Sequence, residues 1–284
     1  MKKIILLALV GLLFFCSREP ETIEEYIKAG EKSFVDEEYQ QARRYFSQAL
    51  ARTPSDRNLL YLMGVAYYRE LMNDSAIVYL KRADLLFPND REINLALYEA
   101  SISSDDYKNA RDALKVLVKT GDPIDSHLDE LASLSISLKD FPYAYHYYRQ
   151  LLKREPENPN RYLQVANTAA EIGSLDISMA VIDSAIEEFG QIEQFMANKG
   201  LYHAVRKDYI TSEEIFRSLI AKDSTALTYR LNLANVLNSQ NSTKKKREAL
   251  QIYINFRDET GSEQWLDSLI SSLEKKLNLG KQQQ

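Results

Sequence analysis

The sequence predicts an all-α protein built as a stack of repeated helix pairs. Three observations predict this class: an internal repeat of 34 residues, apolar residues at helical spacing within each repeat, and a low glycine content. The chain has 284 residues, of which 45% are hydrophobic, 27% are charged and nine are glycines. A chain of this composition can bury a substantial core and is expected to be mainly helical.

The repeat keeps one register along most of the chain. Its units start at Ile23, Arg57, Arg91, Asp125, Pro159, Glu193 and Leu227. Position 8 is small in six units: Gly30, Gly64, Ala132, Ala166, Gly200 and Ala234. Position 20 is always small: Ala42, Ala76, Ala110, Ala144, Ser178, Ser212 and, after an insertion of three residues, Ala249. Position 24 is large in the first six units: Phe46, Leu80, Leu114, Tyr148, Ile182 and Phe216.

This spacing has a physical reading. One unit holds two helices of about 13 residues each and two tight turns, which is enough for each helix to bury an apolar stripe. Small residues at positions 8 and 20 are expected to face each other and to let the two helices cross closely. Tyr98 breaks this rule in the third unit, so it should swing outward or find space beside Ser101 and Ser104.

These offsets resemble the tetratricopeptide repeat family. Its loose consensus has aromatic residues at positions 4, 11 and 24, a small residue at position 8, alanine at 20 and 27, and proline at 32. The first unit carries it as Tyr26, Gly30, Ala42, Phe46, Ala49 and Pro54, and the second as Gly64, Tyr67, Ala76, Ala83 and Pro88. The resemblance covers residues 23–261 and implies a right-handed α-solenoid of about seven helix-turn-helix units, a fold that binds other proteins.

The segment after the repeats is predicted to be a capping helix. Its apolar residues recur at helical spacing: Trp265, Leu266, Leu269, Ile270, Leu273 and Leu277. A helix that is polar on its other face can cover the last apolar layer of an open-ended stack. We therefore expect a capping helix over residues 262–279 and a disordered tail over 280–284.

The amino-terminal residues differ in character from the rest of the chain. Lys2 and Lys3 precede an unbroken apolar stretch from Ile4 to Phe15, and Cys16, the only cysteine, follows at once. This layout is typical of a secretion signal, and the stretch is shorter than the roughly 20 residues that a transmembrane helix needs. The segment resembles a bacterial lipoprotein signal, which implies a signal peptide over residues 1–15, lipidation of Cys16 and a short tether over 16–22.

One residue departs from that pattern. Lipoprotein signals usually have a small residue directly before the cysteine, and here the residue is Phe15. An uncleaved hydrophobic anchor with an incidental cysteine therefore remains the alternative. Ser17 after the cysteine resembles the residue that permits outer-membrane sorting, so we expect the protein on the periplasmic face of the outer membrane.

The sequence contains no pattern of catalytic or ligand-binding chemistry. It has no metal-ligand cluster and no glycine-rich phosphate loop, and His127, His146 and His203 fall at unrelated repeat positions. The charge is slightly acidic, with 36 basic and 41 acidic residues, so a nucleic-acid partner is not indicated. The one basic run, Lys244–Arg247, is interpreted as a solvated loop. We predict a non-enzymatic protein without cofactor or metal.

The family resemblance places partner binding on the concave side of the array, at positions 2, 5, 9, 12 and 13 of each unit. Near the amino terminus these positions bring aromatic residues and an arginine: Phe34, Tyr61, Tyr68 and Arg69. Near the carboxyl terminus they bring amides: Asn160, Asn167, Asn235 and Asn238. Aromatic and arginine side chains are frequent interface hot spots, and amides can hydrogen-bond an extended peptide.

The resulting hypothesis is a lipid-anchored envelope scaffold. Its groove would bind a peptide or helix of a protein partner, in the assembly of an outer-membrane, pilus or cell-wall complex. The alternative from another class is a periplasmic carrier that binds a small ligand or glycan in the same groove.

Overall fold

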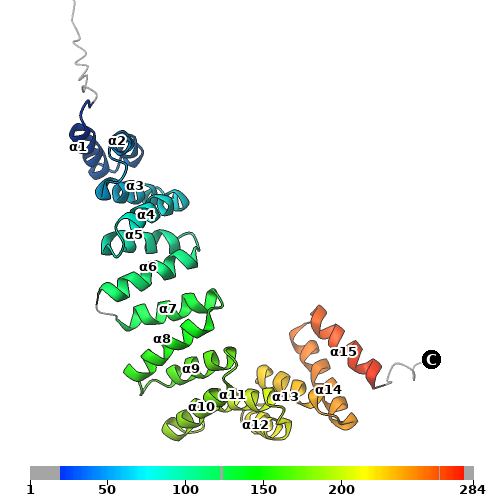
Figure 1. Cartoon of the computed structure of the whole chain (residues 1–284). Helices are drawn as coiled ribbons and strands as arrows, with labels where there is room; N and C mark the ends of the chain where they lie inside the picture. The colour runs from blue at the N-terminus through cyan, green and yellow to red at the C-terminus, as the bar shows by residue number, and fades with distance from the viewer. Residues whose placement is uncertain (1–19, 122–123, 262, 278–284) are drawn as a thin grey trace, which may run out of the picture. The chain divides into compact units, whose positions relative to one another are not determined.

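The computed structural model describes residues 20–121, 124–261 and 263–277 (Figure 1). Within these ranges the chain forms fifteen α-helices and no strand, so the predicted all-α class is confirmed. The chain divides into two compact units, Met1–Pro123 and Ile124–Gln284. Each unit consists of consecutive helix pairs, and each helix packs mainly against its neighbours in the chain.

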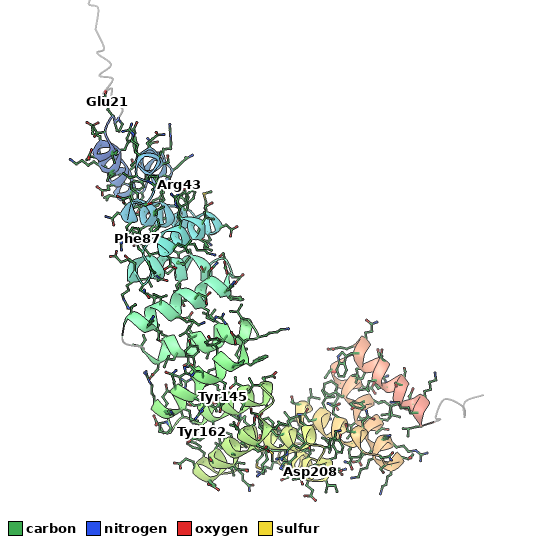
Figure 2. All side chains as sticks on the ribbon, in the orientation of Figure 1. Glu21, Arg43, Phe87, Tyr145, Tyr162 and Asp208 are labelled. Carbon is green, nitrogen blue, oxygen red and sulfur yellow. The ribbon has the colours of Figure 1, made fainter. Side chains whose placement is uncertain are left out.

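The first unit contains three helix pairs: α1 (Ile23–Val35) with α2 (Tyr39–Arg52), α3 (Arg57–Arg69) with α4 (Asn73–Leu86), and α5 (Arg91–Ile102) with α6 (Tyr107–Thr120). The first helix of every pair begins at the residue that the repeat register predicts. Phe46 of α2 is fully buried in an apolar cluster of this unit, and Phe87, labelled in Figure 2, packs against that cluster from the end of α4.

The second unit contains four helix pairs and a last single helix. The pairs are α7 (Asp125–Ser137) with α8 (Phe141–Arg154), α9 (Pro159–Glu171) with α10 (Leu175–Phe189), α11 (Glu193–Val205) with α12 (Tyr209–Lys222), and α13 (Leu227–Ser239) with α14 (Thr243–Thr260). The last helix is α15 (Gln264–Lys276). Tyr162 of α9, labelled in Figure 2, packs edge-on against Phe189 with 5.5 Å between ring centroids.

Polar side chains fix where several first helices begin. Thr22 accepts a hydrogen bond from the Glu25 amide at 3.2 Å, and the Glu25 carboxylate accepts one from the Thr22 amide at 3.2 Å. Asp56 and Asp90 cap α3 and α5 through the amides two or three residues further on. These bonds satisfy backbone donors that an α-helix leaves unpaired at its amino terminus.

The close crossing inside a pair depends on positions 8 and 24. A methyl group built on Gly64 would lie 2.5 Å from the Leu80 side chain, and one built on Gly30 would lie 2.5 Å from the Phe46 ring. The large residue at position 24 therefore occupies the space that a side chain at position 8 would need. The sequence predicted the small residues but paired position 8 with position 20 alone, whereas position 24 makes the tightest contact.

Position 20 also faces position 8, as expected. In two units it is a serine whose buried hydroxyl donates to the position 8 carbonyl of the facing helix: Ser178 to Ala166 at 2.8 Å and Ser212 to Gly200 at 2.7 Å. Serine replaces alanine here without an unsatisfied hydroxyl. The exceptional Tyr98 is partly buried and packs against the apolar cluster around Leu80 and Leu97.

The three inserted residues of the seventh unit lengthen a helix. α14 has 18 residues, whereas the second helices of the other pairs have 14 or 15, and the buried Ala249 lies one turn further from its start. The run Lys244–Arg247 therefore belongs to the first two turns of α14, and the prediction of a loop was wrong. Ser242 caps this helix by accepting from the Lys245 amide, so the inserted residues continue the helical ladder.

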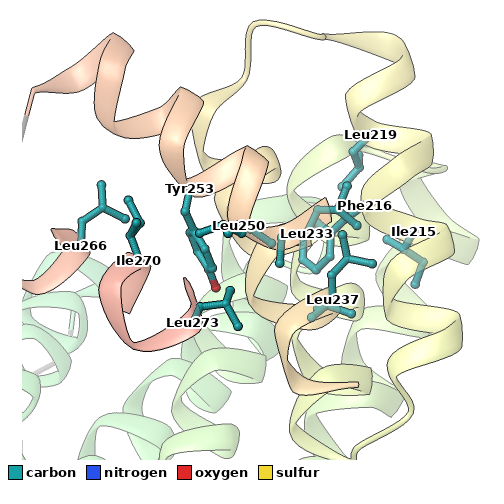
Figure 3. Close-up of a cluster of buried hydrophobic side chains, with 13 residues drawn as sticks. Ile215, Phe216, Leu219, Leu233, Leu237, Leu250, Tyr253, Leu266, Ile270 and Leu273 are labelled. Carbon is teal, nitrogen blue, oxygen red and sulfur yellow. The ribbon is translucent and has the colours of Figure 1, made fainter. Parts of the chain in front are cut away.

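The last helix covers the carboxyl-terminal end of the apolar core. Leu266, Ile270 and Leu273 of α15 are buried against a cluster that contains Tyr253 of α14 (Figure 3). Trp265, which the sequence placed on the same apolar stripe, is instead 47% exposed and donates its indole N–H to Glu263. It precedes the buried Leu266 by one residue, and this step of about 100° turns its side chain away from the core.

The turn inside each pair uses an unusual backbone conformation. In six pairs, position 15 has a positive φ: Glu37, Leu71, Asp105, Lys139, Gly173 and Lys207. The amide that follows it donates to the carbonyl five residues earlier, as from Met72 to Tyr67 at 3.0 Å. This is the Schellman ending of a helix, in which glycine is the usual residue. Only one of the six turns has it.

Several predicted features lie outside the described residues. These are the signal peptide over 1–15, the lipidated Cys16 with most of the tether, and the tail over 280–284. Among the helices that the structure describes, none combines the length and apolar character needed to cross a membrane.

Leu71→Gly should stabilise the compact unit Met1–Pro123. Leu71 has a φ of 60° and is 82% exposed, so glycine would relieve a left-handed conformation that costs an L-residue about 1–2 kcal/mol without losing a buried contact. The greater freedom of glycine in the unfolded chain offsets about 0.5–1 kcal/mol of this gain. We expect a net increase of up to about 1 kcal/mol in the free energy of unfolding, measured by urea titration.

The matched control is Val35→Gly, at an exposed residue that ends α1 with helical geometry. It should lower the free energy of unfolding by about 0.5–1 kcal/mol. Equal destabilisation by both substitutions would contradict the assignment of strain to position 15.

Candidate partner-binding site

A pocket in the compact unit Met1–Pro123 coincides with the predicted aromatic cluster. We call it the α3–α5 pocket; its volume is about 680 Å³, and only two helices line it. From α3 come Tyr61, Val65, Tyr68 and Arg69, and from α5 come Glu92, Leu95, Ala96 and Glu99. All of them except Ala96 occupy repeat positions 2, 5, 9, 12 or 13, the positions assigned to the groove.

Tyr61 is held in a charged corner of the α3–α5 pocket. The Arg57 guanidinium lies 5.6 Å from the Tyr61 ring centroid, and it also donates to Asp90 at 2.8 Å and to Glu92 at 2.6 Å. Burial, followed by the charge of Glu92, raises the pKa of Tyr61 above its usual value. The hydrogen bond from Arg57 holds the pKa of Asp90 below its usual value. Tyr61 is therefore a neutral hydroxyl beside a fixed ion pair.

Two charged groups of the α3–α5 pocket remain available to a ligand. Arg69 is exposed at the end of α3, and Glu99 is exposed on α5. Within the described part of the chain, neither side chain forms a hydrogen bond or an ion pair. The pocket thus combines apolar walls with one guanidinium and one carboxylate that can each bind an opposite charge.

Phe34 does not join this pocket. It lies on α1, where its ring packs edge-on against Tyr39 at 5.4 Å and tilted against Phe46 at 6.5 Å between centroids. The structure therefore brings Tyr61, Tyr68 and Arg69 together and places Phe34 at the edge of the core. Glu92, which was not among the predicted residues, also lines the pocket and occupies position 2 of the third repeat, one of the positions assigned to the groove.

In the compact unit Ile124–Gln284, the Asn167 side chain forms a hydrogen bond with Tyr202. Its side-chain oxygen accepts a hydrogen bond from the hydroxyl of Tyr202, a tyrosine at position 10 of the next repeat, at 2.8 Å. Burial raises the pKa of Tyr202 to about 12. A buried tyrosine hydroxyl needs a partner, and Asn167 supplies it.

Asn235 and Asn238 serve a second buried tyrosine. The oxygen of Asn235 accepts from the Tyr253 hydroxyl at 2.7 Å, and Tyr253 is fully buried. Burial raises the pKa of Tyr253 to about 12, and a hydrogen bond from the Asn238 side chain opposes part of this rise. Three of the four predicted amides thus help to hold the core together. Asn160, exposed near the start of α9, is the remaining one.

An ion pair occupies another polar position of the predicted groove. Arg161 of α9 is largely buried and donates to both carboxylate oxygens of Asp129, at 2.5 and 2.6 Å, and to Glu155 at 3.0 Å. The hydrogen bonds from Arg161 and then Asn158 hold the pKa of Glu155 below its usual value. Asp129 therefore fastens one repeat to the next, which is a structural task.

The three histidines lie apart, as their repeat positions indicated. His146 is exposed and pairs with Gln150 at 2.8 Å, whereas His203 contacts Asp208 at 2.9 Å within the turn after α11. In the part of the chain that the structure describes, no group of three His, Cys, Asp or Glu side chains is placed to hold a metal ion.

The role of Asn167 can be tested with a double-mutant cycle. Asn167→Ala should lower the free energy of unfolding by about 1–3 kcal/mol, because it leaves the Tyr202 hydroxyl without an acceptor. Tyr202→Phe in the same chain should restore part of this loss, since removing both polar partners is nearly neutral. Urea titrations of the two single variants and the double variant measure the coupling. Strictly additive effects would show that the two side chains do not interact.

Comparisons with known proteins give structural neighbours only. No family model and no curated protein matches the sequence. A tetratricopeptide repeat protein from Parabacteroides merdae ATCC 43184 has 12% identity, with 88% of this chain and 98% of that chain covered, and a TM-score of 0.48. YrrB, a TPR protein with an unusual peptide-binding site, has 14% identity, with 65% and 95% covered, and a TM-score of 0.44. MamA has 20% identity, with 58% and 91% covered, and a TM-score of 0.40.

The geometry of the chain itself defines its fold. Its first helices begin 34 residues apart, a small residue at position 20 faces position 8, and a large residue at position 24 is buried in every pair. These are the features of the predicted repeat. The chain is an α-solenoid of 34-residue helix pairs.

Proposed function

We propose that this protein is a non-catalytic scaffold that binds a segment of a partner protein in the α3–α5 pocket. The observation that supports this most strongly is that Tyr61, Tyr68 and Arg69 line one pocket together. Tyrosine and arginine are the side chains that dominate binding energy at protein interfaces. Rigid helices hold all three, so little conformational entropy is lost on binding.

The chemistry of the pocket fits a peptide better than a substrate. Val65 and Leu95 supply apolar walls, and Leu95 is 47% exposed, so a partner can bury it. Arg69 and Glu99 offer opposite charges at the same pocket. A volume of about 680 Å³ accommodates a few side chains of a longer segment. No nucleophile with an adjacent base lies among the lining residues.

We also propose that the protein is exported and anchored by lipid at Cys16 on the periplasmic face of the outer membrane. The support is the basic start, the short apolar stretch and the position of the only cysteine. A tether of about six residues reaches roughly 20 Å at most, which would keep α1 near the lipid. The partner would then be an envelope protein, in the assembly of an outer-membrane, pilus or cell-wall complex.

The pocket can be tested with Tyr61→Ala combined with Tyr68→Ala. Each hot-spot side chain contributes about 2 kcal/mol or more, so this double variant should lose the main partner on purification from solubilised membranes. Quantitative mass spectrometry of the co-purified proteins measures the loss, and circular dichroism checks that the helices remain.

The control for this experiment is Asn160→Ala, which removes a predicted groove amide that does not support a buried tyrosine. It should leave recovery of the partner unchanged. Loss of the partner with Asn160→Ala and retention with the tyrosine variant would show that the partner binds to the compact unit Ile124–Gln284 instead. Binding of a glycan or small molecule, without any protein, would favour the carrier alternative.

The anchor is tested separately with Cys16→Ala. Acylation needs the cysteine sulfur, and the chain has no other cysteine, so labelling with a fatty-acid probe should disappear. In the unchanged protein a mature anchor of two or three chains should hold firmly to the membrane, because each buried methylene contributes about 0.8 kcal/mol. Equal labelling of both proteins, or no labelling of either, would refute the lipoprotein hypothesis.

A further inference from the structure

The compact unit Met1–Pro123 has a second hollow that shares no residue with the α3–α5 pocket. We call it the α4–α6 hollow; its volume is about 360 Å³. α4 contributes Lys81, Asp84 and Leu85, α5 contributes Asn94 and Leu97, and α6 contributes Lys108, Asn109, Asp112, Ala113 and Val116. Two of the three helices are second helices of their pairs, which the repeat-based prediction of a groove did not consider.

Two departures from the repeat create this hollow. At position 23 the third repeat has Ala113. The other repeats have Tyr45, Tyr79, Tyr147, Val181, Ile215 and, after the insertion, Ile252. At position 4 the third repeat has Asn94, whereas five other repeats have Tyr26, Leu60, Leu128, Tyr162 and Met196. Large apolar side chains are thus missing at two positions of the same repeat, and both replacements line the hollow.

The floor of the hollow is fixed by hydrogen bonds. Asn94 is 1% exposed, and its amide nitrogen donates to Asp84 at 2.8 Å and to the Asp90 carbonyl at 2.9 Å. Ala113 and Leu97 are also buried. The hydrogen bond from Asn94 to Asp84 joins α5 to α4. A buried amide with two good acceptors resists rearrangement, so the two helices do not shift closer to fill the space.

Apolar side chains beside the hollow are left uncovered. Leu85 is 81% exposed, and Val78, seven residues earlier on the same face of α4, is 65% exposed. Val116 of α6 lies partly buried on the other side. A hollow with an exposed apolar stripe at helical spacing is the arrangement that a partner's apolar side chain can cover.

The charges at the rim indicate which partner fits. Asp84 accepts from Asn94, and Asp112 lies 3.7 Å from both Lys115 and Arg111. Lys81 of α4 and Lys108 of α6 form no hydrogen bond or ion pair within the described residues. The rim therefore has partnered carboxylates and two ammonium groups without partners, which a segment carrying carboxylates would complement.

We infer that the α4–α6 hollow is a second docking site, which takes a large apolar side chain from an acidic segment of a partner protein. The apolar side chain fills the volume that Ala113 leaves, and flanking carboxylates pair with Lys81 and Lys108. This inference does not depend on the α3–α5 pocket, because the two sites have no residue in common.

The test uses the full-length protein and two labelled synthetic peptides. Both have a central phenylalanine and leucine; one has glutamates on either side, and the other has lysines at the same places. Fluorescence anisotropy should show tighter binding of the glutamate peptide by at least about tenfold, and this preference should shrink as salt is raised. Equal affinities for the two peptides would overturn the inference.

Three variants locate the binding. Ala113→Tyr puts into the hollow the residue that three other units have at this position, and it should weaken the glutamate peptide by at least about tenfold. Lys81→Gln with Lys108→Gln should weaken it by a smaller factor and reduce the salt dependence. These two lysines are exposed, so this variant tests the site even if Ala113→Tyr were to perturb folding.

The controls distinguish the α4–α6 hollow from the α3–α5 pocket and from a general effect of surface charge. Lys28→Gln with Lys32→Gln removes two exposed charges of α1, a helix that does not line the hollow, and should leave binding unchanged. Tyr61→Ala with Tyr68→Ala should also leave it unchanged. Loss of the glutamate peptide in the tyrosine variant alone would assign the binding to the α3–α5 pocket. Binding of phosphatidylglycerol vesicles, lost with the two lysines, without peptide binding would assign the lysines to a membrane surface.

Discussion

The close crossing of the two helices in each pair is the constraint on which the rest of the structure depends. Where position 8 is glycine, the side chain at position 24 fills the place of its missing Cβ, as Leu80 does at Gly64 and Phe46 does at Gly30. Neither helix can rotate or slide without a clash or a cavity, because packed interiors tolerate little change in volume. In these pairs the register of the first helix, and so the direction of its outward side chains, follows from this contact.

A fixed register leaves the outward positions free to differ between repeats, and the two sites arise in different ways. The α3–α5 pocket uses outward positions of consecutive first helices, so Tyr61 and Tyr68 reach it by spacing alone. The α4–α6 hollow exists because Ala113 and Asn94 replace large residues of the repeat. One scaffold thus presents an aromatic site through regularity and an apolar hollow through an exception.

The sequence predicted the features that depend on spacing and missed those that depend on local geometry. Helix starts follow from the recurring small and large residues. The left-handed turn at position 15 could not be predicted, since Leu71 and similar residues replace the glycine that would mark it. The basic run Lys244–Arg247 was predicted to be a loop, but it is helical. An insertion of three residues equals almost one helical turn, so it can lengthen a helix without changing which face is buried. Outward side chains such as Phe34 were misplaced, because spacing does not define how far a ring folds back onto the core.

The buried tyrosines explain why the amides and the aromatic residues have different tasks. A tyrosine inside an apolar layer adds contact area but brings a hydroxyl that must be paired, and Tyr202 and Tyr253 obtain that pairing from Asn167 and Asn235. An amide oxygen that accepts such a bond is held in place by the fold, and its removal would leave a buried hydroxyl unpaired. Side chains whose polar ends the fold does not use carry no such structural task. In the first unit Arg69 meets this condition beside the apolar walls of a pocket, and that combination gives a partner both specificity and buried area.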